Sequence, residues 1–108
     1  MRDLTELDML ESYLTTNGFE YTREDADDTF PPEMREACEQ VGIEYEPMDL
    51  HQIIVYKNGV RSWDVICHRG SYGCEKGLLE GMGKIFGPDV EGFLTAGDII
   101  KRIEEATT

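Results

Sequence analysis

The stretch "LHQIIVYKNGVRSWDVICH", from Leu50 to His68, decides the fold. Two runs rich in β-branched and aromatic residues flank Asn58-Gly59. An Asn-Gly pair in this setting is a strong signal for a hairpin, because both central positions of the tight turn need a positive φ. The stretch therefore predicts an antiparallel hairpin whose strands span about residues 50–57 and 60–68.

A two-residue turn pairs Lys57 with Val60, and this pairing sets which side chains share a face of the hairpin. In this register Ile54 lies opposite Trp63. The face expected to join the core consists of Leu50, Gln52, Ile54, Tyr56, Trp63, Val65 and Cys67. The other face is expected to hold His51, Ile53, Val55, Ser62, Asp64 and Ile66, with His68 beyond.

Two helical patterns precede the hairpin. Leucines three or four residues apart predict a helix over about residues 3–16, and Asn17-Gly18 supplies its C-terminal stop. "FEYTR", which follows, alternates as a short strand does. A second helix is predicted over about residues 32–41, with one stripe formed by Met34, Ala37, Cys38 and Val41.

After the hairpin the apolar period changes from two to 3.6. Leu78, Leu79, Met82, Ile85 and Phe86 predict a helix over about residues 74–86. "VEGFL" is expected to add an edge strand. Thr95 and Asp98 form a capping box that opens a last helix over about residues 96–106.

These elements predict an α+β fold: a small antiparallel sheet built around the central hairpin and packed against three to four helices. The length of 108 residues is that of a single domain spanning residues 1–108. Within it, residues 24–49 are expected to form an acidic, variable region of loop and short helix.

The net charge of −13 is unevenly distributed. Residues 1–50 hold fifteen Asp or Glu and three Arg, a net charge of −12, whereas residues 51–108 hold eight acids and seven bases. Such an anionic surface repels phosphates, so direct binding of DNA or RNA is not expected, and a basic partner is favoured.

The chain shows neither a signal peptide at its start nor an apolar run long enough to span a membrane. Three cysteines, an odd number, do not form a disulfide scaffold and suit a reducing compartment. We therefore expect a cytoplasmic protein with no membrane partner and no cofactor.

Several residue patterns suggest chemical sites but have ordinary structural explanations. Cys67 and His68 are adjacent in a strand and point to opposite faces, so a zinc site with Cys74 is disfavoured. Cys74 near a helix N-terminus could be a nucleophile, but no oxyanion hole or orienting residue accompanies it. "GSYGCEKG" lacks the order of a phosphate loop, and "EDADD" lacks that of a calcium loop. No catalytic residue is assigned, and the chain is not expected to be an enzyme.

One candidate metal site remains on the hairpin. In the predicted register His51, Asp64 and His68 share a face, where they could hold a metal ion or relay a proton. A half-exposed polar sheet face explains the same residues without a function, and this explanation is favoured.

The stretch "HQIIVYKNGVRSWDVICHRGSYGCEKGLLEGMG", together with "VEGFLTAGDIIKRIE", resembles small uncharacterised acidic proteins encoded by bacteriophages and prophages. The resemblance covers roughly residues 50–105. It implies a phage genomic context, and with it the cytoplasm of a bacterial host, and it carries over no site residue.

Charge and context together predict an accessory protein that inhibits a basic host protein, a nuclease or a CRISPR effector, by mimicking nucleic acid in its channel, as an anti-CRISPR protein does. Two other classes stay open: a small structural or assembly protein, for which a homodimer is conceivable, and a small metal- or Cys/His-dependent enzyme. The residues expected to bind the partner are Glu20, Tyr21, Glu24, Asp25, Asp27, Asp28, Phe30, Glu33, Glu36, Glu39, Glu44 and Glu46. Of these, the aromatic side chains Tyr21 and Phe30 are expected to act as anchors.

Overall fold

The computed structural model describes residues 2–107 of the chain. Their elements, in order, are α1 (Thr5–Thr16), β1 (Glu20–Ala26), α2 (Pro32–Val41), β2 (Leu50–Lys57), β3 (Val60–Ile66), a 3-10 turn η1 (Cys74–Lys76), β4 (Leu79–Gly83), β5 (Glu91–Leu94) and α3 (Ala96–Thr107). The five strands form one antiparallel sheet in the order β1-β2-β3-β4-β5. The predicted α+β class with a central hairpin is confirmed.

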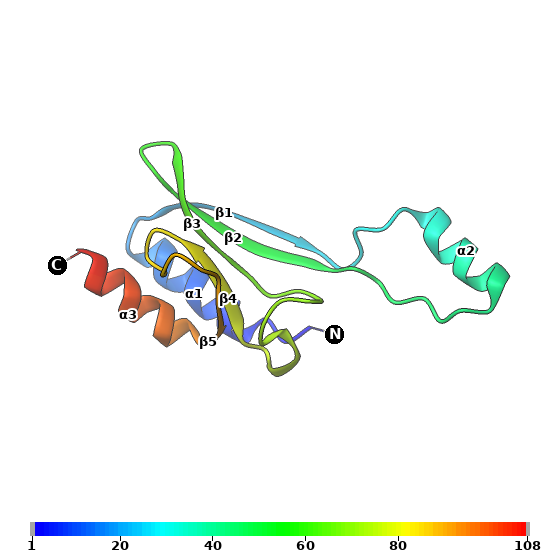
Figure 1. The fold of residues 1–108 in the computed structure, drawn as a ribbon. Coiled ribbons are helices and arrows are strands. Elements are labelled where there is room, and N and C mark those ends of the chain that lie inside the picture. The colour runs from blue at the N-terminus through cyan, green and yellow to red at the C-terminus, as the bar shows by residue number, and fades with distance from the viewer. Residues whose placement is uncertain (1, 108) are drawn as a thin grey trace.

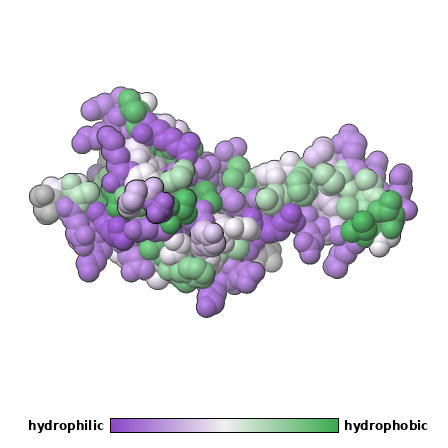
Figure 2. Space-filling model, in the orientation of Figure 1, coloured by the Kyte–Doolittle hydropathy of each residue, from purple (hydrophilic) through white to green (hydrophobic). Residues whose placement is uncertain are grey.

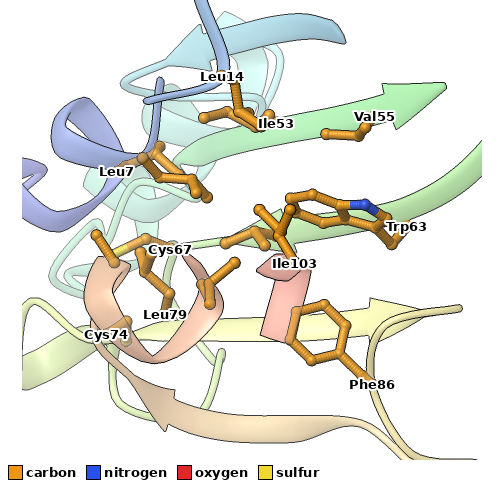
Figure 3. Packing of buried hydrophobic residues seen from close by; sticks show 14 residues of the cluster. Leu7, Leu14, Ile53, Val55, Trp63, Cys67, Cys74, Leu79, Phe86 and Ile103 are labelled. Atoms are coloured by element: carbon orange, nitrogen blue, oxygen red, sulfur yellow. The ribbon is translucent and has the colours of Figure 1, made fainter. Parts of the chain in front are cut away.

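Helices α1 and α3 pack side by side on the same face of the sheet (Figure 1). Leu7 and Leu14 of α1 converge there with Ile53 and Trp63 of the sheet and with Ile103 of α3 (Figure 3). The buried apolar side chains are Leu7, Leu10, Leu14, Ile53, Val55, Trp63, Val65, Cys67, Cys74, Leu79, Phe86, Ala96, Ile99 and Ile103. One core therefore lies between the two helices and one sheet face, and its apolar burial is the main stabilising contribution.

The hairpin forms as predicted at its turn but not along its strands. Asn58 and Gly59 have φ values of 54° and 77°, and Lys57 pairs with Val60. A bulge then shifts the register by one residue, so that Val55 lies opposite Trp63. The prediction for β3 was right, because Trp63, Val65 and Cys67 are buried.

The prediction for β2 was wrong. The side chains on the core face of β2 are His51, Ile53 and Val55, while Gln52, Ile54 and Tyr56 are only half-buried on the open face. A single extra residue in one strand is enough to exchange the two faces of its partner, since side chains alternate with a period of two.

The helix predicted over residues 74–86 is also wrong. After the three-residue turn η1 the chain forms β4, which pairs with β3, and then turns into β5. Gly81 explains the difference, because a Cβ atom built on it would lie 2.3 Å from Cζ of Phe86. The glycine lets the Phe86 ring pack directly on the backbone of β4, a close approach that glycine permits in a strand.

The remaining elements match the sequence. The edge strand β5 is present, and α3 begins with the predicted capping box, in which Thr95 N donates to Asp98 Oδ2 and Asp98 N donates to Thr95 Oγ1. Helix α1 ends at Thr16, with Asn17 as its C-cap, and Gly18 follows with a φ of 72°.

Between β1 and β2 the chain leaves the body as an arm, defined here as residues 27–49, with α2 at its far end (Figure 1). The arm gives the molecule its elongated shape of 56 × 26 × 25 Å. The predicted second helix is confirmed in position, but none of its residues is buried. This helix therefore contributes almost nothing to the core.

Candidate functional site: the acidic arm

The arm concentrates negative charge on a projecting segment. Its carboxylates are Asp27, Asp28, Glu33, Glu36, Glu39, Glu44, Glu46 and Asp49, and its only basic residue is Arg35, so the arm carries a net charge of −7. More than half of the net charge of the chain thus lies on residues 27–49. A dense field of one sign on an extended surface attracts and orients molecules of the opposite sign.

The arm is held in shape by its own aromatic residues. The hydroxyl of Tyr45 donates a hydrogen bond to Asp28, whose other carboxylate oxygen accepts from Phe30 N at 3.0 Å. The Phe30 ring meets the Tyr45 ring edge-on with centroids 6.5 Å apart, and the guanidinium of Arg35 lies 4.7 Å from the centre of the Tyr45 ring. These contacts join the two sides of the arm, so α2 is presented on an ordered support.

The root of the arm is fixed to the body by an ion network around Asp49. Arg2 donates to Asp49 through Nε at 2.9 Å and through a terminal nitrogen at 3.1 Å, and the backbone N of Arg69 donates to it at 2.9 Å. Partial burial favours the neutral acid, but the hydrogen bond and charge of Arg2 and the Arg69 N–H outweigh it, so the pKa of Asp49 falls to about 2. Asp49 is therefore fully ionised at neutral pH.

His51 completes this root. Its side chain is 4% exposed, with Nδ1 2.8 Å from Asp25 Oδ1 and Nε2 3.3 Å from Asp49 Oδ2. Arg2, Asp27, Pro47, Asp49 and His51 line an open hollow of about 530 Å³ beside these contacts. The polar groups of His51 and Asp49 are thus used to tie β1, β2 and the arm together.

Some of the residues predicted to bind a partner make contacts within the protein. Asp25 is paired with Arg23 at 3.0 Å as well as with His51, and Glu46 lies 3.7 Å from Arg69. Asp28 and Phe30 belong to the support of the arm. Tyr21 lies on the core face of β1, and its hydroxyl contacts the hydroxyl of Thr15 on α1 at 2.7 Å. The two aromatic side chains predicted as anchors are therefore half-buried and make contacts within the protein.

The other predicted carboxylates are available. Within residues 2–107 the following side chains make no hydrogen bond or ion pair: Glu20, Glu24, Asp27, Glu33, Glu36, Glu39 and Glu44. Glu20 is the first residue of β1 and lies far from the arm. Glu24 lies on the open face of the sheet, near the root of the arm. The structure gathers the remaining five on the arm, three of them on α2.

The sequence prediction missed an apolar component of this surface. Met34, Val41 and Ile43 are 41%, 67% and 62% exposed, and Figure 2 shows apolar side chains gathered at the far end of the arm. The helical stripe of Met34, Ala37, Cys38 and Val41 was visible in the sequence, where such a stripe normally indicates a face toward the core. Here the stripe is left open and bordered by glutamates.

The candidate metal site on the hairpin is not formed. Because of the bulge, His51 lies on the core face of the sheet and Asp64 on the open face, where Gln52 Nε2 donates to Asp64 Oδ2 at 3.0 Å. His68 lies beyond β3, with Nδ1 3.0 Å from the carbonyl oxygen of Arg69. Across residues 2–107 no group of three or more His, Cys, Asp or Glu is placed to hold a metal ion.

The cysteines are all free thiols, and two of them belong to the core. Burial raises the pKa of the Cys67 thiol to about 11, which keeps it protonated at neutral pH. Cys74 begins the short turn η1 and is 7% exposed. As predicted, Cys67 is a core residue.

No helix in the described part of the chain has the length and apolar character needed to cross a membrane. Comparison with protein-family models, with curated proteins and with solved structures finds no match to this chain.

Proposed function

We propose that the chain is a protein-binding inhibitor whose acidic arm occupies a basic channel of a host protein, such as a nuclease or a CRISPR effector, and displaces nucleic acid from it. The observation that carries the proposal is the arm itself: a projecting, internally supported segment with a net charge of −7 and a helix that buries none of its residues. A fold gains little stability from such a helix, so its ordered display is best explained by binding.

The physical basis is competition for cations. A nucleic-acid channel presents Lys and Arg at spacings that suit phosphates, and carboxylates on a rigid support can pair with the same groups. Glu33, Glu36 and Glu39 lie three residues apart on α2, close to one helical turn each. Steering by the field of the arm accelerates association at low salt, and added salt weakens it.

The apolar stripe gives the arm specificity for a protein over a simple polycation. A partner that accepts Met34, Val41 and Ile43 in an apolar groove gains burial energy that does not depend on salt. Two arms facing one another would place their own glutamates in contact, so like-charge repulsion disfavours a homodimer through this surface. The molar mass from light scattering distinguishes a monomer, which can offer its arm to a partner, from a homodimer.

The test uses two variants with the same change of charge. The arm variant is Glu33→Gln, Glu36→Gln and Glu39→Gln together, and the body variant is Glu75→Gln, Asp89→Asn and Glu104→Gln, three exposed carboxylates outside the arm. Proteins captured from a bacterial host lysate at low and high salt are identified, and the affinity of the purified partner is measured for each variant.

If each lost contact is worth about 0.5 to 1 kcal/mol, the arm variant loses at least about tenfold in affinity, whereas the body variant stays within about twofold of the wild type. The wild type also displaces bound nucleic acid from the partner. Equal losses in the two variants, or a partner that binds this chain and nucleic acid together, would contradict the proposal.

A further inference from the structure

A second hollow lies at the opposite end of β1 and β2 from the arm. It has a volume of about 540 Å³ and is formed by the start of β1, the β2–β3 hairpin, the β4–β5 connection and the end of α3. This volume lies within the range of pockets that bind small molecules. Its walls belong to the body of the protein and are independent of the arm.

The inner wall of this pocket is apolar. Val55, Trp63 and Ile103, which lie near one another in Figure 3, are only 2%, 3% and 3% exposed, and Phe19 and Ile85 add half-buried apolar surface. The indole N–H of Trp63 has no hydrogen-bond partner within residues 2–107 and is not sealed from solvent. A buried tryptophan usually satisfies this group, so a residue that lines the pocket keeps an unused donor.

The rim of the pocket carries positive charge. Lys57 at the hairpin and Lys84 after β4 line it, and within the described residues neither ammonium group makes an ion pair or a hydrogen bond. Glu20 is the one carboxylate among the lining residues. In a chain of net charge −13 the rim is therefore a local region of net charge +1, which is the reverse of the arm.

We propose that this pocket binds a small amphiphilic anion, with an apolar body and one carboxylate head group. The apolar body lies against the half-buried side chains of Phe19 and Ile85, with Trp63 at the inner wall, and burial of the remaining apolar surface supplies the affinity. The head group lies at the rim between Lys57 and Lys84, whose charges select an anion. The occupant is a small molecule, because the lining residues form a half-open hollow of a size that small molecules fill.

Decanoate is a suitable probe, with decyltrimethylammonium as its cationic counterpart of equal chain length. Trp63 is the only tryptophan of the chain, so its fluorescence reports occupation of the pocket directly. Below the micelle concentration, decanoate is expected to change the Trp63 emission, and the change should saturate as the decanoate concentration rises. Decyltrimethylammonium is expected to bind at least about tenfold more weakly, since the two unpaired lysines attract the carboxylate and repel the ammonium group.

Three variants locate the site. The double variant Lys57→Gln and Lys84→Gln is expected to weaken decanoate binding about tenfold, and Glu20→Gln to strengthen decanoate binding about twofold. Ala106→Phe, at the exposed end of α3, is expected to fill the mouth of the pocket and abolish decanoate binding. Thermal unfolding confirms that each variant is folded. The arm variant should bind decanoate as the wild type does, so failure here is separable from failure of the proposed inhibitory function. Equal affinity for both probes, or unchanged binding in Ala106→Phe, would overturn the proposal.

Discussion

At the scale of single residues, Asp49 joins the arm to the body. Its side chain is 12% exposed and receives hydrogen bonds from Arg2 at one end of the sequence and from Arg69 after the hairpin. Arg69 also donates to the carbonyl oxygens of Glu46 and Pro47 at 2.9 and 3.3 Å. These contacts hold the returning segment of the arm against the body.

Asp49→Asn keeps the shape of the side chain and removes its charge, so it isolates the ionic contribution. Because the pKa of Asp49 is lowered from 3.8 to about 2 in the folded protein, the charged form stabilises the fold above the unfolded pKa, and this stability is lost as the pH falls through 4 toward 2. The variant is expected to lose about 2 kcal/mol of unfolding free energy at pH 7, measured by urea denaturation.

The pH dependence separates this effect from a general loss of packing. The difference in unfolding free energy between wild type and Asp49→Asn should shrink steadily between pH 4 and pH 2. Asp89→Asn, an exposed carboxylate, serves as the control and should stay within about 0.5 kcal/mol of the wild type throughout. A difference for Asp49→Asn that is constant with pH would show that its charge does not stabilise the root.

At the scale of elements, local sequence signals were sufficient to predict turns and helix caps that require particular residue types. The Asn58-Gly59 turn, the Thr95 capping box and the stop at Gly18 were all readable in the sequence. The bulge between Val55 and Tyr56 was not. Near it, the carbonyl oxygen of Ser62 in β3 accepts a hydrogen bond from Lys84 N at 3.1 Å, a contact between distant residues that a local pattern does not encode. This one-residue shift in register exchanges the two faces of β2, and without it the sequence predicted a metal site that the structure does not form.

The apolar residues of β4 and of the turn after it gave the other misleading pattern. Apolar residues at a helical spacing predicted a helix, yet this spacing comes from two strand residues followed by a turn onto Phe86. Gly81→Ala is expected to lose about 2 kcal/mol of stability, because its methyl group would overlap the Phe86 ring. Gly87→Ala, where the nearest atom lies 3.6 Å from the added Cβ, should change stability by less than about 0.5 kcal/mol. Equal thermal shifts in the two variants would contradict the packing assigned to Gly81.

At the scale of the whole molecule, the uneven charge was the most informative property of the sequence, but composition alone could not say which carboxylates are free. Asp25 and Asp28 look equivalent to Glu33 and Glu36 in the sequence, and only the fold shows that the first two are bonded within the protein. The projection of α2 was likewise hidden, because its apolar stripe is the pattern of a helix that packs on a core.

The arm is the part of this molecule that we expect a basic partner to meet. Polylysine added to the labelled protein at low salt tests this expectation through the change in backbone amide NMR signals. We expect the shifts to gather in residues 33–44 and around the root at Asp27, to fade as salt is raised, and to be suppressed when Glu33, Glu36 and Glu39 are replaced by Gln. Shifts spread evenly over the body, or strongest near Glu75 and Glu104, would contradict it.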